Sequence, residues 1–454
     1  MRQQEEQRPS HQLSSFARYL NKVFAFRSAS DLLTDSRHQP EISAAAVFRA
    51  VFHGLVFRLT SFQQLQSDIA QPAFQRWIGV ERAFGDDVLR YSLCGFDLAA
   101  LETMLVQVNR TLKRNKSFDS GRVQGRIVAA LDGIEVLSSY SRCCEACLER
   151  RISYVEADGT PGERIQYYHR AVGCQIVSAP VKPILAIEWL QPGEGEDTAA
   201  LRLFRRIAEL YGPRFFDILL LDSLYAQAPV LRLTQELGGD VVIALKQERR
   251  ELYQNAMGLF QARPADSEFE RQQEGEYRRV QLWQAADLPF TQDYPLPVRV
   301  VRSEEEVTHR KIQGGKPCQQ TTRQQWLWIS TLEAQAFPAQ RIWQLGHLRW
   351  KNENNGWNDL TQNWALKHGF LHACKHRPKT VAPNGELQSV PNRGLAAVVL
   401  ILCLAFTLFS AFVRLHSKLF RRYRLTLVEV ARQLHRSLWQ LSPPIRSPAH
   451  SAGS

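Results

Sequence analysis

The sequence has little cysteine and no recognisable secretory signal. Cysteine accounts for eight of 454 residues, too few for a disulfide-stabilised secreted scaffold. Residues 1–8 are polar and charged, and no apolar stretch follows them, which excludes a typical signal peptide. We therefore expect a cytoplasmic protein whose thiols are reduced.

Acidic residues are also in deficit. The chain has 45 Asp and Glu against 57 Lys and Arg, a formal net charge of +12. Such a surface favours a polyanionic partner, either nucleic acid or an anionic membrane. Charge alone does not separate these two partners.

Two of the acidic residues stand at informative positions. The apolar runs 127–131 and 218–221 are each followed by one aspartate, Asp132 and Asp222. Short apolar runs predict buried strands, and ligand chemistry in α/β folds gathers at the carboxyl ends of strands. Asp is also common in turns. Two neighbouring carboxylates would nevertheless need cations between them, and hard divalent ions suit oxygen ligands.

Four segments resemble landmarks of the DDE transposases of bacterial insertion sequences. These are 132–133, 167–170, 222–226 and 349–358. The resemblance implies an α/β fold with a ribonuclease H-like catalytic core, in which Asp132, Asp222 and Glu353 are catalytic and hold two Mg²⁺ or Mn²⁺ ions. It also implies that Arg349, four residues before Glu353, contacts DNA.

The implied function is DNA transposition, in which the ends of an insertion sequence are cleaved and joined to target DNA. The partners would be double-stranded terminal inverted repeats and target DNA, bound by a homodimer. A Lys usually follows the Glu in this family, whereas this chain has Leu360 and Thr361 there and Lys367 further on. A catalytically inactive DNA-binding derivative is therefore an alternative.

The pattern of apolar and polar residues divides the chain into five regions, and the resemblance implies the role of each. Residues 1–118 form a helical DNA-binding region that ends in cations including Lys113 and Lys116. Residues 119–261 and 323–438 form the two parts of the ribonuclease H-like core, and 262–322 form a β-rich insertion between them. Residues 439–454 form a disordered tail.

A long helix is predicted over 338–368. Arg349, Glu353, Trp357, Leu360 and Trp364 share one face of it. The aromatic and aliphatic members indicate that this face packs inward, and a buried Glu needs a partner such as a metal ion. In the insertion, Trp283 is a candidate for stacking on an unpaired base, although tryptophans more often belong to cores.

Cys144 and Cys147 have the C-x-x-C spacing of half a structural zinc site. Nearby His169, Cys143 and Cys174 are candidates to complete it, and buried reduced thiols are the alternative. Three further histidines at a spacing of four, His368, His372 and His376, are interpreted as solvated residues or phosphate contacts.

Residues 394–413 carry no charge and are long enough to cross a membrane, with basic residues after them. A membrane-anchored protein is therefore a second alternative. We expect instead a buried helix that covers the catalytic sheet, as the transposase resemblance implies, and hence no membrane.

Overall fold

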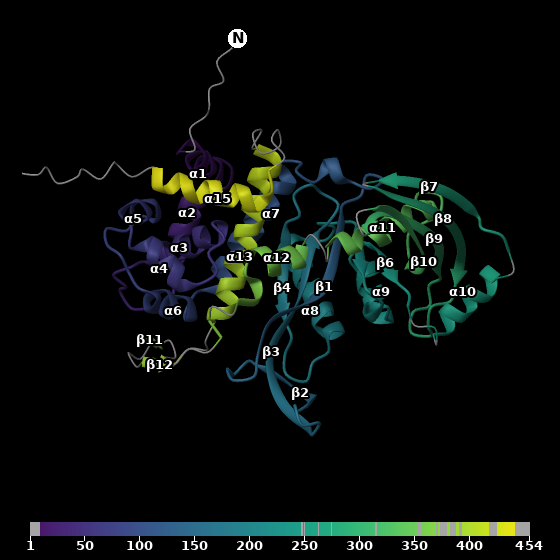
Figure 1. Cartoon of the computed structure of the whole chain (residues 1–454), viewed down its shortest axis with the longest axis horizontal. Coiled ribbons are helices and arrows are strands. Elements are labelled where there is room, and N and C mark those ends of the chain that lie inside the picture. The colour runs from purple at the N-terminus through teal and green to yellow at the C-terminus, as the bar shows by residue number, and fades with distance from the viewer. Residues whose placement is uncertain are drawn as a thin grey trace, which may run out of the picture. The chain divides into compact units, whose positions relative to one another are not determined.

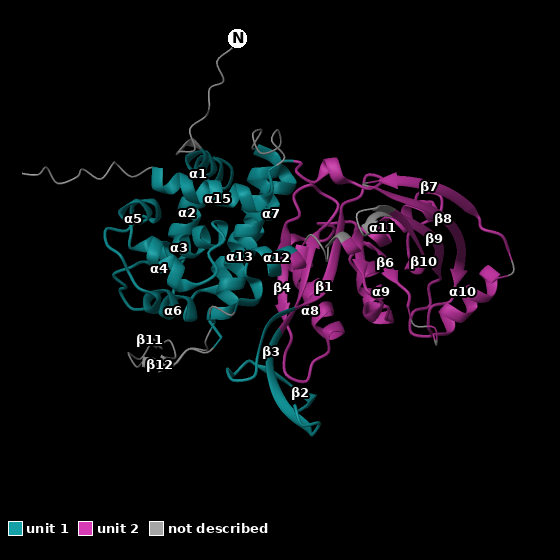
Figure 2. Ribbon diagram, in the orientation of Figure 1, with its two compact units in different colours: residues 1–115, 135–169, 359–454 teal, residues 116–134, 170–358 magenta. Residues whose placement is uncertain are grey.

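The computed structural model divides the chain into two compact units (Figure 2). Unit 1 comprises residues 1–115, 135–169 and 359–454, and unit 2 comprises 116–134 and 170–358. The structure describes residues 10–246, 248, 250–261, 263–273, 275–313, 316–352, 356–368, 371–372, 379–381, 387–389, 393–416 and 425–440.

Unit 1 is mainly helical (Figure 1). Its helices are α1 (Ser10–Phe24), α2 (Phe26–Asp31), α3 (Ala44–Val56), α4 (Phe62–Ile69), α5 (Pro72–Ile78), α6 (Asp86–Cys94), α7 (Leu98–Arg114), α12 (Asn358–Asn363, from its second residue), α13 (Gly394–Ala411) and α15 (Leu427–Gln440). Ser43, Ser61 and Asp97 cap α3, α4 and α7 by accepting hydrogen bonds from backbone amides of the first turn, as expected for these residue types.

The apolar stretch forms α13, which lies at the centre of unit 1. Among the described residues, Gly394–His416 is the one helical segment long and apolar enough to span a membrane, and 89% of its most apolar window is buried. It packs against α3, α6 and α7. The prediction of a buried core helix agrees with this packing, and within unit 1 its partners are the N-terminal helices.

Unit 1 also contains a long β-hairpin. Strand β2 (Leu148–Val155) pairs antiparallel with the first half of β3 (Pro161–Ile176). The second half of β3 belongs to unit 2, where it pairs with β4 (Ile184–Trp189). A short pair, β11 (Lys379–Val381) and β12 (Leu387–Ser389), also lies in unit 1.

Unit 2 is built on a mixed sheet. Its central strands run in the order β4, β3, β1, β5 and β6. Strand β1 spans Val128–Ser139, β5 spans Ile218–Leu221 and β6 spans Asp240–Ala244. The β1–β5 and β5–β6 pairs are parallel, and the crossovers include α8 (Glu196–Tyr211) and α9 (Ala228–Glu236). This mixed α/β arrangement is the predicted ribonuclease H-like core.

The β-rich insertion continues this sheet. Its strands are β7 (Ser267–Gln273), β8 (Glu276–Leu288), β9 (Val298–Gln313) and β10 (Lys316–Ser330), preceded by α10 (Glu251–Gln261). The end of β10 pairs with β6 at Trp328–Ala244 and Ile329–Ile243. Strand β10 therefore runs from the predicted insertion, which ends at 322, into the predicted second part of the core.

Two predicted elements differ in length from the observed ones. Strand β1 continues through Asp132 to Ser139, so this aspartate lies within the strand instead of at its end. The helix predicted over 338–368 is observed as α11 (Ala339–Asn352) and α12 (Asn358–Asn363), and residues 353–355 between them lie outside the described residues. It ends at Asn363, and Leu366–His368 form a short 3₁₀ turn. The inward face is confirmed for its described members, since Arg349, Trp357, Leu360 and Trp364 are all buried.

A charge placed in the middle of α13 should unfold unit 1. Leu402 is 1% exposed, and Leu402→Arg would bury an unpaired cation at a cost of several kcal/mol. We expect a large fall in the melting temperature. Leu32→Arg is the matched control, because Leu32 is 79% exposed. Equal melting temperatures for the two variants, or recovery of the wild-type chain only from membranes, would contradict the assignment of a core helix.

Candidate active site

Asp132 and Asp222 lie at the same level of two adjacent strands. The parallel β1–β5 ladder pairs Ala130 with Leu220, and each aspartate lies two residues beyond that pair. The pairing of β1 with β5 ends at Ala130 and Leu220, whereas β1 itself continues to Ser139. Asp132 and Asp222 keep 20% and 33% of their side chains exposed. The strand pairing thus brings two accessible carboxylates together.

Arg349 bridges the two carboxylates. Its Nη1 lies 3.5 Å from Oδ2 of Asp132, and its Nη2 lies 4.0 Å from Oδ1 of Asp222. The guanidinium is 6% exposed and comes from the last turns of α11, which packs on β5 and β6. The sequence predicted these three residues as one site, and the structure brings them together.

Lys246 is a site residue that the sequence analysis missed. It follows β6, and its Nζ lies 3.4 Å from Oδ1 of Asp222. Partial burial alone would raise the pKa of Asp222, but the Ser223 amide and the charges of Arg349 and Lys246 outweigh it and lower that pKa. The carboxylate is therefore ionised at neutral pH. The sequence around Lys246 has no motif that would mark it as a site residue. Only its position just after β6, the strand next to β5, connects it to the site.

Glu353 lies outside the described residues, but residues on both sides of it are fixed in unit 2. Arg349 precedes it by four residues and contacts both aspartates. Trp357 follows it by four residues and packs on Gly173 of β3. A Cβ at Gly173 would lie 2.5 Å from the Trp357 ring, so this contact requires glycine.

A further carboxylate, Glu196, lies beside Asp132. It begins α8, and a Cβ on Gly133 would lie 2.1 Å from its Oε2. Its Oε1 accepts a hydrogen bond of 2.7 Å from the Tyr225 hydroxyl, and Arg170 forms an ion pair with Oε2. With 10% of its side chain exposed, Glu196 is held by its own partners.

The remaining predicted DNA-contacting residues come from α7, the segment just after it and β8. Lys113 lies in the last turn of α7, and Lys116 is an exposed residue just after that helix. Trp283 is 7% exposed, donates its indole N–H to the Arg263 carbonyl and stacks under Arg302. Its ring is covered by Arg302 and its N–H is already bonded, which is the environment of a core tryptophan.

The predicted zinc ligands do gather, within unit 1. Cys144, Cys147 and His169 are joined by His372, and the ligand atoms of all four lie within 4.8 Å of one another. Cys143 is exposed and does not join them, and Cys174 is buried in unit 2. The prediction that His372 is merely solvated or a phosphate contact is wrong for this residue, which is 4% exposed.

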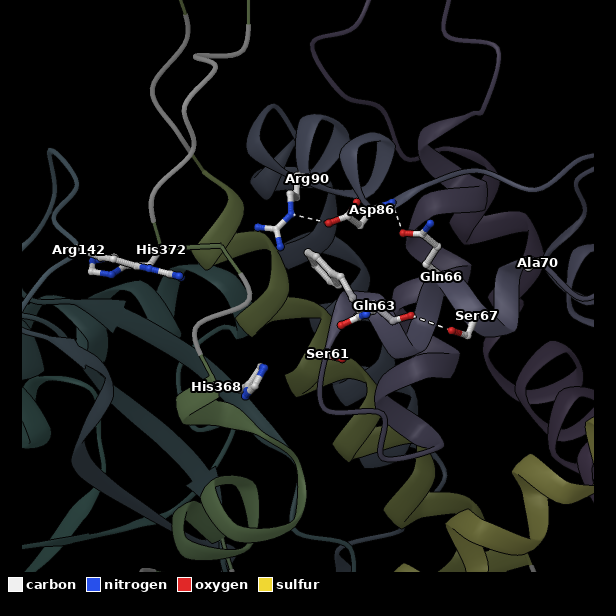
Figure 3. A pocket seen from close by; sticks show the side chains of 11 residues that line it. Ser61, Gln63, Gln66, Ser67, Ala70, Asp86, Arg90, Arg142, His368 and His372 are labelled. Atoms are coloured by element: carbon white, nitrogen blue, oxygen red, sulfur yellow. Dashed lines mark hydrogen bonds and ion pairs between the residues drawn. The ribbon is translucent and has the colours of Figure 1, made fainter.

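A polar cavity of about 890 Å³ lies next to this cluster in unit 1 (Figure 3). His372 and Arg142 line one side, and His368 and the residues of α4 and α6 line the rest. In α6, Arg90 donates to Asp86 at 3.1 Å. Neither Asp132 nor Asp222 lines this cavity.

A buried carboxylate ties the insertion to α11. Glu305 on β9 has a fully buried side chain. Its Oε1 accepts hydrogen bonds of 2.9 Å from both Trp343 and His347 of α11, and Arg278 of β8 forms an ion pair with Oε2. Since α11 carries Arg349, this network fixes the helix that supplies the active-site guanidinium.

Acid titration should expose the contribution of Glu305. Burial would raise its pKa, but hydrogen bonds led by that from His347 outweigh burial and lower the pKa to about 2. A lowered pKa means that the stabilisation is present above the unfolded pKa of about 4.3 and is lost as the pH falls towards 2. Glu305→Gln should cost about 3 kcal/mol near pH 7, because it removes the ionised acceptor of Trp343 and His347, while Arg278 keeps Glu276 as a partner.

Urea unfolding between pH 7 and pH 2 measures this difference. The difference in the free energy of unfolding between wild type and Glu305→Gln should become smaller as the pH falls from about 4 to 2. Glu306→Gln is the control, since this neighbour is 44% exposed and pairs with an 85% exposed arginine, a surface pair worth about 0–1 kcal/mol. If that difference in the free energy of unfolding stays constant down to pH 2, an ionised Glu305 does not stabilise the fold.

Comparison with known proteins matches part of the chain to a known class of domain. Residues 154–357 match the family model described as a transposase DDE domain. Among solved structures, the cryo-EM structure of a piggyBac transposase synaptic complex with hairpin DNA is similar at 11% sequence identity and a TM-score of 0.37, covering 96% of this chain and 82% of that chain. No curated protein sequence matches the chain.

Proposed function

We propose that this chain, a DDE transposase by the domain matched at residues 154–357, cuts and joins DNA at the site formed by Asp132, Asp222 and Glu353. A divalent metal requirement follows from the family, and we assign the ions as two Mg²⁺ or Mn²⁺. The observation that carries the proposal is the bridging of Asp132 and Asp222 by Arg349.

The residues present fit such ions. Both aspartates are partly exposed and offer hard oxygen ligands, which Mg²⁺ and Mn²⁺ prefer. The structure already balances their charge with Arg349 and Lys246, as two like charges at this spacing require. Glu353 would be the third ligand, because the fixed residues Arg349 and Trp357 stand on either side of it.

The proposed reaction uses the same residues twice. First, water attacks phosphorus at the element's end and a DNA 3′-hydroxyl is released. The freed 3′-hydroxyl then attacks a phosphodiester of target DNA, so one bond to phosphorus forms and one breaks in each step. Divalent ions held by Asp132, Asp222 and Glu353 would supply activation of the attacking oxygen and stabilisation of the leaving oxygen. Arg349 and Lys246 would contact the phosphate and offset its charge.

The partners follow from this function. The protein binds DNA, and we propose that the DNA comprises double-stranded terminal inverted repeats and target DNA, bound by a homodimer in the cytoplasm. Lys113 and Lys116 remain candidate DNA contacts. We also propose a structural Zn²⁺ at the cluster containing Cys144, Cys147 and His169. That ion has no part in the two steps above.

Removing any one carboxylate ligand should abolish cleavage and preserve DNA binding. Asp132→Ala, Asp222→Ala and Glu353→Ala should each lower metal-dependent nicking of an end substrate by about 10³-fold or more. Their combined loss should be far from additive, because the three act as a unit. Affinity for the same DNA should stay close to wild type, since Lys and Arg supply the phosphate contacts.

Glu196→Gln distinguishes the two candidates for the third ligand. It removes the one other carboxylate that the described residues place beside Asp132 and keeps an acceptor for the Tyr225 hydroxyl. We expect this variant to keep metal-dependent nicking if it melts like wild type. If Glu353→Ala nicked at the wild-type rate and a folded Glu196→Gln did not, Glu196 would be the ligand and the assignment of Glu353 would be wrong.

Arg349→Ala should behave differently from the carboxylate variants. It should weaken DNA binding as well as nicking, and it should reduce the slope of log affinity against log salt by about 1. Arg82→Ala is the control for loss of one charge, because Arg82 is an exposed residue of unit 1 paired with Glu41. An unchanged salt slope for Arg349→Ala would show that its guanidinium does not contact a DNA phosphate.

A further inference from the structure

We infer that Cys144, Cys147, His169 and His372 together bind one structural zinc ion, and that His372 is its fourth ligand. This site is separate from the transposition chemistry. The sequence pointed to the first three residues, whereas His372 is 225 positions from Cys147. Only the folded chain brings it to the cluster.

The spacing of the four ligand atoms matches a tetrahedral zinc site. Bonds of about 2.3 Å to sulfur and 2.0–2.1 Å to nitrogen place neighbouring ligand atoms about 3.3–3.8 Å apart. The Sγ atoms of Cys144 and Cys147 are 3.7 Å apart, and His169 Nε2 lies 3.2 and 3.4 Å from them. His372 Nε2 lies 3.0 Å from Cys147 Sγ. These four separations are close to the required edge lengths, and the two remaining ones, which both involve His372, are at most 4.8 Å.

The local backbone also suits bound thiolates. Cys144 and Cys147 flank a tight turn in which the Cys147 amide donates to the Cys144 carbonyl at 3.1 Å. The Cys144 amide in turn donates to Cys147 Sγ at 3.2 Å. The same turn holds the two Sγ atoms 3.7 Å apart, which is the spacing of two thiolates on one zinc ion.

The burial of His372 is costly without a ligand role. Its Nδ1 is buried and has no hydrogen-bond partner in the part of the chain that the structure describes, and a buried unpaired polar atom costs about 1–3 kcal/mol. Nε2 points to the cluster instead of to solvent. Bonding to zinc would offset that cost, whereas hydrogen-bonded thiols alone would not explain why a second imidazole is enclosed.

The donor set selects the metal and its role. Two thiolates and two imidazoles are the ligands of structural zinc, and four protein ligands leave no open position for substrate. Mg²⁺ and Mn²⁺ prefer oxygen. The ion would connect three parts of unit 1: the turn before β2, the strand β3 and the segment at 371–372. Its role is therefore to hold the hairpin and this late segment together.

Metal analysis of the purified full-length chain tests the inference. Wild type prepared without chelators should contain about one zinc per chain. X-ray absorption of the zinc should show two sulfur and two nitrogen neighbours. A folded wild-type chain that holds no zinc, even after incubation with Zn²⁺, would overturn the proposal.

Variants with matched neighbours test each ligand. Losing a group that only orients a metal ligand lowers metal affinity by about 10- to 100-fold. Cys144→Ser and His372→Ala each remove a ligand, so they should lower zinc affinity by more than this. Cys143→Ser and His368→Ala should retain zinc, since both residues are exposed neighbours outside the cluster. If Cys143→Ser lost zinc and His372→Ala kept it, the site would use three cysteines and our assignment of His372 would be wrong.

Chelation provides a test that does not depend on any variant folding. A strong zinc chelator should lower the melting temperature of wild type, and Zn²⁺ but not Mg²⁺ should restore it. Restoration by Mg²⁺ alone would locate the effect at the oxygen ligands and would count against a structural zinc ion. Because melting is measured without DNA, failure here leaves the proposed transposase function unaffected, and failure of DNA cleavage leaves the zinc site unaffected.

Discussion

The parallel pairing of β1 with β5 is the constraint on which the active site depends. It puts Asp132 and Asp222 at one level of adjacent strands, where their like charges repel. Two carboxylates at this distance stay ionised only if cations lie between or beside them. Arg349 and Lys246 meet that need in the protein alone. The electrostatics of the site therefore follow from a backbone register.

The same constraint explains how far the sequence could predict the site. A buried strand followed by a carboxylate is a local pattern, and Arg349 with Glu353 is a local spacing, so Asp132, Asp222 and Arg349 could be identified and grouped. The identity of β5 as the neighbour of β1 came from the family resemblance. Lys246 and Glu196 carry no such local pattern, because their roles arise from the position of β6 and of the first turn of α8.

Long-range packing accounts for the other differences. The length and apolarity of α13 identified a buried helix, but no periodicity could show that its partners are α3, α6 and α7, some 300 residues earlier in the chain. His372 was likewise misjudged, because the spacing of three histidines suggested a solvated face and the cysteines it meets lie far away in sequence. The pattern of residues within one segment predicts which of its faces is apolar. It does not predict which other segment packs against that face.

The insertion shows how a β-rich segment can serve the active site without supplying a catalytic group. Because β10 pairs with β6, the insertion strands extend the sheet that carries the aspartates. Glu305 then binds α11 from the insertion side through Trp343 and His347. The helix that presents Arg349 is thus held by β5 and β6 beneath it and by β9 beside it. Movement of α11 would take the Arg349 guanidinium away from both carboxylates. The buried hydrogen bonds of Glu305 restrict that movement.

The two proposed metal centres differ in ways that match their roles. Asp132 and Asp222 keep a fifth to a third of their side chains exposed, and oxygen ligands of this kind bind Mg²⁺ while leaving room for water and phosphate. In the other cluster His169 and His372 are buried, and all four sulfur and nitrogen donors face one point. A fully coordinated ion has no position for substrate, so it can stabilise the fold but cannot catalyse. Exposure and donor type therefore separate a catalytic centre in unit 2 from a structural one in unit 1.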